Sequence, residues 1–166
     1  MDKEKETKIA VLTVSDGVTL GIREDLSGAL AVRLIQAGLH PDTLTALAVP
    51  DDLKQISDTL RVWAGEGYKL VITSGGTGIS PRDNTPQATL SVIDYQVPGI
   101  AELMRSESLK KTPMAALSRA VAGVRGRTLI INLPGSPKGV QECLDAVMPV
   151  LPHAIEQLES GAGHAK

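Results

Sequence analysis

The stretch KLVITSGGTGISPRDNTP, residues 69–86, decides the fold. Its first five residues (69–73) form an apolar run typical of a strand buried on both faces, as in a parallel sheet. The rest is the most glycine-rich part of the chain and ends in Thr85-Pro86, which resembles an N-cap followed by proline at the first helical position. The segment therefore predicts a strand, a glycine loop and a helix, a unit of α/β proteins.

The same alternation of strands and helices continues on both sides of this segment. Gly38 is expected to stop the first helix, and Arg125-Gly126-Arg127 predicts a hairpin between the last two strands. Residues 16–27 are polar, and we expect a flexible loop there. The predicted strands are 8–14, 43–49, 69–73, 120–124 and 128–133, and the predicted helices are 28–38, 51–65, 86–93, 98–107, 137–147 and 152–159.

These elements predict the α/β class, with a mixed, mainly parallel sheet between helices on both faces, which makes three layers. At 166 residues and 17.4 kDa, the chain has the size of one ordinary domain. We find no linker or internal repeat and expect a single domain over 1–166. Its ordered core should run from about 8 to 160, with a frayed tail.

Composition excludes several classes of function. The 17 basic residues are balanced by 19 acidic ones, so no electrostatic partner such as nucleic acid is indicated. No apolar run is long enough to span a membrane, and the start of the chain resembles neither a signal nor a transit peptide. Cys143 is the single cysteine and cannot form an intrachain disulfide. We therefore expect a cytoplasmic protein without membrane or nucleic-acid partners.

Polar clusters follow four of the predicted strands. They are Ser15-Asp16, Pro50 to Asp52, Ser74 to Asp83 and Pro134 to Lys138. Ligands of open α/β sheets bind outside the carboxyl ends of the strands, where sequence-distant loops converge if the strands are parallel. The sequence therefore predicts a binding site built from these four loops.

The chemistry of these loops favours an anionic ligand. Gly75, Gly76 and Gly78 allow the backbone to approach a phosphate, and helix N-termini at Thr85-Pro86 and Ser136-Pro137 would attract one. Neither the P-loop pattern nor GxGxxG is present. Carboxylates beside a phosphate are unfavourable without a cation, so Asp51 and Asp83 point to Mg²⁺. Together these features suggest Mg²⁺-assisted phosphoryl or nucleotidyl transfer.

Several of these residues also have purely structural interpretations. Asp51 could cap a helix that begins after Pro50, with Asp52 as an acid in the first turn. Asp16 could cap a turn or contact phosphate. Ser136 fits an N-cap at the ligand site. Cys143, like Trp63, fits a helical apolar stripe and is expected in the core, and the three histidines lack the paired spacing of a zinc site.

The segment SGGTGISPRDNTPQAT (74–89) resembles the signature loop of the MogA/MoaB family of molybdenum-cofactor biosynthesis proteins. Other family landmarks occur in order. They are VSD (14–16), Asp25 with Ser27-Gly28, PD (50–51), PG (98–99), LSRAVAGVRG (117–126) and INLPGSPKGVQECLDAVMPVLPHAIEQL (131–158). The last of these is especially similar to the G domain of the plant two-domain molybdenum-cofactor protein. The resemblance covers essentially the whole chain after residue 7.

The resemblance implies a MogA/MoaB-like three-layer fold, commonly trimeric, that binds molybdopterin and adenylylates it with Mg-ATP. It places the two carboxylates needed for turnover at Asp51 and Asp83, which we interpret as holding Mg²⁺ and not abstracting a proton. A protein that later inserts the metal is a possible partner. The candidate residues for binding substrate or nucleotide are Ser15, Asp16, Ser74, Gly75, Gly76, Thr77, Gly78, Ser118 (the family's pterin-site serine), Arg119, Pro134, Gly135, Ser136 and Lys138.

Two other functions stay open at this point. The same domain could keep the molybdopterin pocket without turnover, as a carrier or scaffold of the MoaB type. A related fold could hydrolyse nucleotide sugars or pyrophosphate, but the LSR (117–119) and PGSP (134–137) segments favour a pterin ligand. The presence of both Asp51 and Asp83 favours the enzyme.

Overall fold

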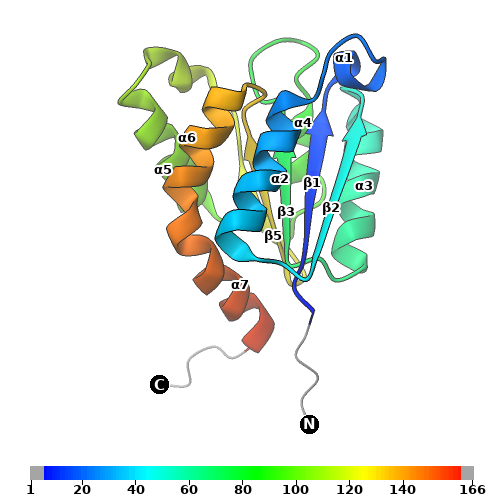
Figure 1. The fold of residues 1–166 in the computed structure, drawn as a ribbon, viewed down its shortest axis with the longest axis vertical. Coiled ribbons are helices and arrows are strands. Elements are labelled where there is room, and N and C mark those ends of the chain that lie inside the picture. Colours follow the sequence, from blue (N-terminus) through cyan, green and yellow to red (C-terminus); the bar gives the residue numbers. More distant parts are fainter. Residues whose placement is uncertain (1–5, 162–166) are drawn as a thin grey trace.

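Parallel pairing dominates the sheet of this protein (Figure 1). The computed structural model describes residues 6–161. Of the frayed tail predicted for 160–166, Ser160 is the last residue of a helix, and residues 162–166 lie outside the described residues. The six-stranded sheet in this part of the chain has the order β2-β1-β3-β6-β5-β4. The first four strands in that order run parallel, and β5 is antiparallel to both β6 and β4. The strands are β1 (Lys8–Val14), β2 (Thr43–Val49), β3 (Leu70–Ser74), β4 (Tyr95–Gln96), β5 (Ala122–Arg125) and β6 (Thr128–Leu133).

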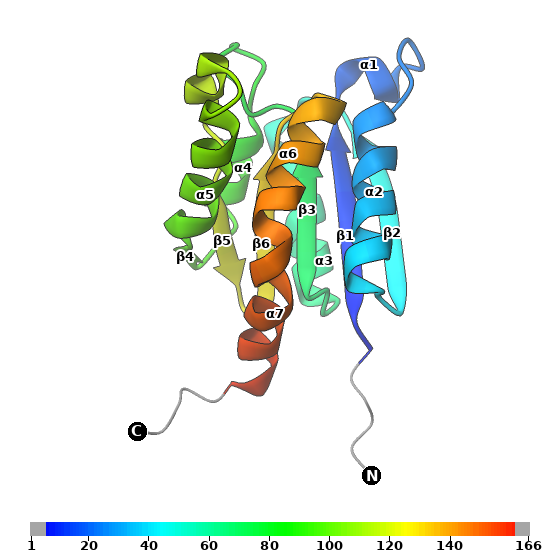
Figure 2. The same ribbon diagram turned by 60° about the vertical axis from the view of Figure 1, so that its left-hand side comes forward.

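Helices cover both faces of the sheet, as predicted. Successive residues of β1 point to opposite faces, so Ile9 and Val11 pack under one layer of helices while Ala10 and Leu12 pack under the other. Figures 1 and 2 show α2 and α6 side by side on one face and α3 on the other. The first layer contains α2 (Leu26–Leu39), α5 (Pro98–Leu109), α6 (Pro137–Val147) and α7 (Leu151–Ser160), and the second contains α3 (Leu53–Gly65) and α4 (Thr85–Leu90).

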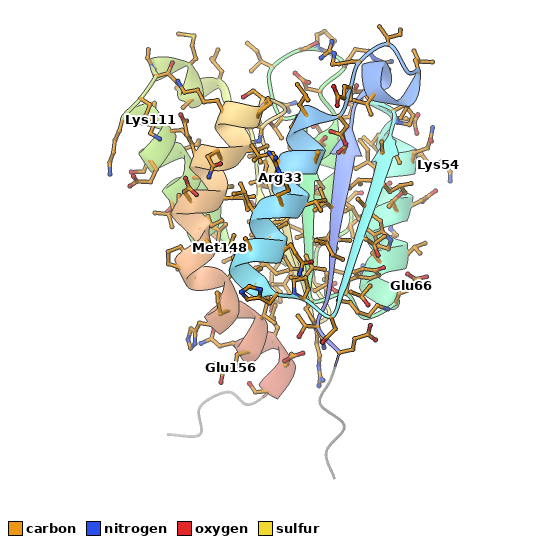
Figure 3. The ribbon with its side chains drawn as sticks, in the orientation of Figure 1. Arg33, Lys54, Glu66, Lys111, Met148 and Glu156 are labelled. Atoms are coloured by element: carbon orange, nitrogen blue, oxygen red, sulfur yellow. The ribbon has the colours of Figure 1, made fainter. Side chains whose placement is uncertain are left out.

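The end of α2 differs from the prediction. The helix continues through Gly38 to Leu39, and His40 takes the left-handed cap conformation with φ 46°. Gly38 serves close packing instead, because a Cβ there would lie 2.8 Å from the Met148 sulfur. Met148 begins the 3₁₀ turn η2 (Met148–Val150) that follows α6, and Figure 3 shows it where α6 and α2 meet. A glycine near a helix end can therefore mark a helix contact rather than a stop.

Short elements escaped the sequence analysis. The stretch 16–27, expected as a flexible loop, contains the one-turn helix α1 (Asp16–Thr19) and the first turn of α2. The 3₁₀ helix η1 (Pro113–Leu117) and the two-residue strand β4 also lacked a periodic signal. The hairpin between β5 and β6 was predicted correctly, with Gly126 at φ 57° in its turn. Within residues 6–161, no helix has the length and apolarity required to cross a membrane.

We expect α3 to depend on its buried face. Leu60 is fully buried between Ile56 and Trp63 against the sheet, whereas Val62 on the same helix is 55% exposed. Leu60→Ala should lower the free energy of unfolding by about 2–5 kcal/mol, because it removes buried methyl groups and leaves a cavity. Val62→Ala should change it by less than about 0.5 kcal/mol. Urea unfolding measures both, and equal losses would contradict this packing.

Candidate functional site

The carboxyl ends of four parallel strands lie at one edge of the sheet. Val14 of β1 pairs with Val49 of β2, and Ser74 of β3 pairs with Leu133 of β6, so the strands end at nearly the same level. Backbone hydrogen bonds continue past these ends, from Ser15 N to Val49 O (2.9 Å) and from Gly75 N to Leu133 O (3.1 Å). The prediction that the four polar loops meet at one edge is confirmed.

Two hollows open at this edge. The first, of about 210 Å³, is polar and brings together seven residues that the sequence predicted: Ser15, Asp51, Ser74, Gly75, Gly76, Asp83 and Gly135. We call it the carboxylate hollow. Gly135 belongs to the loop between β6 and α6. The two aspartates that the resemblance marked for turnover therefore share one cavity with the glycine loop.

Asp16 and Asp51 fix each other through their backbones. The Asp16 N–H donates to Asp51 Oδ2 (3.0 Å), and the Asp51 N–H donates to Asp16 Oδ1 (2.9 Å). Arg82 makes an ion pair with the second oxygen of Asp16. The hydrogen bond from the Asp51 N–H, followed by the Arg82 guanidinium, lowers the pKa of the Asp16 carboxyl. Asp16 thus ties together the loops after β1, β2 and β3.

The helix-cap interpretation of Asp51 is wrong, and so is the description of Asp52 as a first-turn acid. Asp52 is itself the N-cap of α3, since its Oδ1 accepts a hydrogen bond from the Gln55 N–H (2.8 Å). The Asp51 carboxylate instead faces the loop after β1, which contains Asp16, and the glycine loop after β3. Its Oδ1 would lie 3.3 Å from a Cβ placed on Gly76, and among the described residues only Oδ2 accepts a hydrogen bond.

The glycine loop is needed for close approach of the backbone. Gly75 has φ 101°, and a Cβ there would meet the Val14 carbonyl oxygen at 2.3 Å. Gly76 has φ 67°, and a Cβ there would meet Thr85 Oγ1 at 2.4 Å. Thr85 donates a hydrogen bond to the Gly75 carbonyl (2.8 Å) and is not an N-cap, contrary to the prediction. Asn84 takes the cap position of α4, without a side-chain hydrogen bond.

Arg119 holds the loop that carries Asp83. Its Nε donates to the Gly78 carbonyl and its Nη2 to the Asp83 carbonyl, both at 2.7 Å. Its backbone N–H donates to the Thr77 carbonyl (2.8 Å). The Asp83 side chain accepts from the Ser80 N–H through Oδ2 (2.9 Å). The structure thus gives the Arg119 guanidinium protein partners, and its contact with a ligand stays a prediction.

The second hollow, of about 240 Å³, lies between α5, η1, β6 and α6. We call it the apolar hollow. Ser118, Pro134, Ser136 and Lys138 line it, together with Met104 and Cys143 among others. Ser136 caps α6 as predicted, accepting from the Gly139 N–H (3.1 Å). Cys143 is buried as expected, and burial raises the pKa of its thiol.

The predicted site residues therefore fall into three groups. Seven line the carboxylate hollow, and four line the apolar hollow. Pro134 and Ser136 face the apolar hollow while Gly135 between them faces the other, so the loop after β6 separates the two. The remaining predicted residues line neither hollow: Asp16, Thr77, Gly78 and Arg119.

Sequence reasoning gave no site role to several residues of this edge, although Asp25 and Ser27 are among the family landmarks. Arg23, Asp25 and Ser27 line the carboxylate hollow from the segment expected to be a flexible loop. Asp25 caps α2 through the Gly28 N–H (2.8 Å) and accepts from Thr13 Oγ1 (2.6 Å). An aspartate just before an apolar helical pattern is a signal that could have revealed this cap. Glu142 in the apolar hollow carried no such signal, because it lies within an amphipathic helix.

Asp16 should make stability depend on pH. Because its pKa is lower in the folded than in the unfolded chain, its ionised form stabilises the fold above the unfolded pKa of about 3.9. That contribution is lost as the pH falls through the folded-state pKa. Asp16→Asn should therefore be less stable than the wild type at neutral pH, and the difference should shrink in acid. Urea unfolding of both proteins measures this, and a difference independent of pH would contradict it.

Comparisons with known proteins agree with this geometry. Residues 10–153 match the family described as "Probable molybdopterin binding domain". The chain is 46% identical over 151 residues to a molybdopterin adenylyltransferase of Helicobacter pylori, covering 89% of this chain and 85% of that protein. It is 41% identical to gephyrin of Dictyostelium discoideum over 95% of this chain, but spans only 23% of gephyrin.

A crystal structure of the molybdopterin biosynthesis enzyme MoaB from Thermus thermophilus has the same fold. The two superpose with a TM-score of 0.86 and 54% identity, covering 93% of this chain and 97% of the MoaB chain. The expected MogA/MoaB-like fold is confirmed by this match. With a family match over most of its length and relatives well above 30% identity, the chain belongs to the MogA/MoaB family of molybdopterin-binding domains.

Proposed function

We propose that this protein is a molybdopterin adenylyltransferase, which transfers AMP from ATP to the phosphate of molybdopterin and releases pyrophosphate. The observation that carries the proposal is the carboxylate hollow, in which Asp51 and Asp83 lie beside the glycine loop at the ends of four parallel strands. A relative of this chain that is 46% identical carries the same activity in its name.

The reaction needs little proton chemistry. The nucleophile is a phosphate monoester oxygen, and such phosphates are mostly ionised at neutral pH because their second pKa is about 6. A bond forms between this oxygen and the α-phosphorus of ATP, the bond from that phosphorus to the bridging oxygen breaks, and pyrophosphate leaves with the electron pair. The difficulty is to bring two anions together in line, which is a problem of charge and positioning.

The two aspartates fit a magnesium site completed by substrate. Among the described residues no cluster of three or more His, Cys, Asp or Glu could hold a metal by itself. Mg²⁺ commonly uses one or two carboxylates together with substrate phosphates and waters. Asp51 and Asp83 each have one oxygen held by a backbone N–H, and their Oδ1 atoms accept no hydrogen bond from the described residues. The chemistry that Mg²⁺ supplies there when bound is neutralisation of the polyphosphate.

The other residues of the edge orient the two substrates. Asp16 holds the Asp51 backbone, and Arg119 holds the carbonyls of Gly78 and Asp83, so both carboxylates are fixed before substrate arrives. Arg23 supplies positive charge to the carboxylate hollow. Preorganised groups of this kind stabilise a transition state without reorganising during the reaction.

We further propose that the chain acts in the cytoplasm as a homotrimer and hands its product to the protein that inserts the metal. The family resemblance supports these points. Light scattering measures the assembly directly, with an expected mass three times the 17.4 kDa of one chain.

The purified protein, incubated with molybdopterin, ATP and Mg²⁺, should release pyrophosphate and form adenylylated molybdopterin. Asp83→Asn should lower this rate by about a hundredfold or more, because it removes a charge that the transfer requires, while leaving molybdopterin binding unchanged. Chromatography of the pterin product and a coupled pyrophosphate assay give the rates, and fluorescence gives the binding.

The control is Asp145→Asn, on the exposed side of α6, where Asp145 accepts a hydrogen bond from Gln141. It should leave the rate unchanged. A wild-type protein that binds molybdopterin but releases no pyrophosphate is a carrier, and the proposed activity would be wrong. Near-normal turnover by Asp83→Asn would exclude the role given to that carboxylate.

A further inference from the structure

The carboxylate hollow is lined by four carboxylates and one cation. The cation is the guanidinium of Arg23, and the carboxylates belong to Glu24, Asp25, Asp51 and Asp83. Like charges that share a cavity repel one another unless cations compensate them. Each phosphate of ATP adds negative charge, and one Mg²⁺ offsets only part of it. Within residues 6–161, Arg23 is therefore the one side chain lining this hollow that attracts a polyphosphate.

The charge of Arg23 is not used by the described part of the chain. No side-chain hydrogen bond or ion pair within residues 6–161 involves its guanidinium, whereas Arg82 at the same edge pairs with Asp16. The neighbouring Asp25 carboxylate has other partners, the Gly28 N–H (2.8 Å) and Thr13 Oγ1 (2.6 Å). Arg23 is also exposed, so a ligand in the hollow can reach it.

The backbone around Arg23 is held in place. The N–H groups of Ile22 and Arg23 both donate to the Gly17 carbonyl, at 2.9 and 3.1 Å. The guanidinium lies against the same glycine, because a Cβ on Gly17 would be 3.3 Å from Arg23 Nε and 3.7 Å from its Cζ. Figures 1 and 2 show this segment as the loop after α1, beyond the carboxyl end of β1. The guanidinium thus has a defined place before a ligand arrives.

That place adjoins one of the carboxylates proposed to hold Mg²⁺. Gly17 directly follows Asp16, whose N–H donates to Asp51 Oδ2 (3.0 Å). Arginine suits a phosphate there, because its planar guanidinium presents several N–H donors in an arrangement that matches phosphate oxygens. The chain also lacks the P-loop, whose lysine reaches the β- and γ-phosphates in other nucleotide-binding proteins. An arginine from another loop is able to take that part.

The chemistry of the transfer decides which phosphates gain most from this cation. As the bond from the α-phosphorus to the bridging oxygen breaks, negative charge moves onto the departing pyrophosphate. The attacking phosphate monoester loses negative charge in the same step. A cation therefore stabilises the transition state most at the leaving group. Arginines placed at such developing charge raise the rates of other phosphoryl transfers by about a thousandfold or more.

We propose that Arg23 contacts the β- and γ-phosphates of ATP and stabilises pyrophosphate as it leaves. The inference rests on the proposed function, because it takes ATP as the donor of AMP. It adds a catalytic residue from the segment between β1 and α2 to the two aspartates that follow β2 and β3.

The test separates the two anions that meet in the reaction. Arg23→Gln should weaken the binding of inorganic pyrophosphate, measured with Mg²⁺ present, by about tenfold or more, because it removes a charged hydrogen-bond donor. Molybdopterin binding should stay unchanged. The kcat of adenylylation should fall by about tenfold or more, because the lost contact is strongest in the transition state. Calorimetry measures pyrophosphate binding, and fluorescence measures molybdopterin binding.

Arg33→Gln is the matched control, because it removes the same charge from an exposed position on α2 (Figure 3). It should keep the wild-type values of all three quantities. Equal pyrophosphate binding by the wild type and Arg23→Gln would overturn the inference, as would a wild-type protein that does not bind pyrophosphate. A loss of molybdopterin binding as large as the loss of pyrophosphate binding would also contradict it.

Failure of this inference is distinguishable from failure of the proposed function. A wild-type protein that binds pyrophosphate through Arg23 but forms no adenylylated molybdopterin would overturn the transferase proposal and support the contact between Arg23 and a polyphosphate. A protein that adenylylates molybdopterin equally well as wild type and as Arg23→Gln would overturn the Arg23 assignment alone.

Discussion

Parallel pairing at a common level is the constraint on which the rest of this protein depends. Because β1, β2, β3 and β6 run in one direction and end together, four loops distant in sequence must share one edge. The loops are then so close that a side chain does not fit at Gly75, where a Cβ would meet the Val14 carbonyl oxygen at 2.3 Å. The close packing of these loops therefore requires glycine at this position whether or not a ligand is bound.

The charges at this edge follow from the same crowding. Asp16 and Asp51 lie close enough to exchange backbone hydrogen bonds, and two carboxylates in such proximity need compensating donors. Arg82 and the Asp51 N–H supply them for Asp16. Asp51 and Asp83 are each left with one oxygen that accepts no hydrogen bond from the described residues, as the proposed magnesium site requires.

The sequence predicts the sheet well because its signals are local. The apolar run 8–14 is buried throughout after its first residue, as continuous hydrophobicity indicates. The N-cap of a helix is harder to predict where two neighbouring residues could both serve as the cap. Asp51 and Asp52 carry the same signal, and only the bond from Gln55 to Asp52 decides between them. Thr85 likewise fits the pattern of a cap but bonds to Gly75, a partner that no local rule indicates.

Some residues of this edge have no local sequence signal, because tertiary packing alone determines where their side chains lie. Glu142 lies in the amphipathic helix α6, and its side chain is only 9% exposed beside the hollow between α5 and α6. Ser118-Arg119 is a polar pair without a local signal, yet the Arg119 guanidinium donates hydrogen bonds to the carbonyls of Gly78 and Asp83. The environment of such residues is set by contacts between two elements, and the sequence of either element alone does not predict those contacts.

The loop after β6 links the two hollows physically. The Gly135 carbonyl accepts a hydrogen bond from Ser27 Oγ (2.8 Å), and the Pro134 carbonyl accepts one from Ser74 Oγ (3.1 Å). A Cβ at Gly135 would lie 3.3 Å from the Gly75 Cα, so this backbone rests directly on the glycine loop. The two hollows are thus separated by a fixed stretch of main chain. For the proposed transfer between two anions, a fixed main chain matters because misplacement by about 1 Å can lower a rate by about a hundredfold.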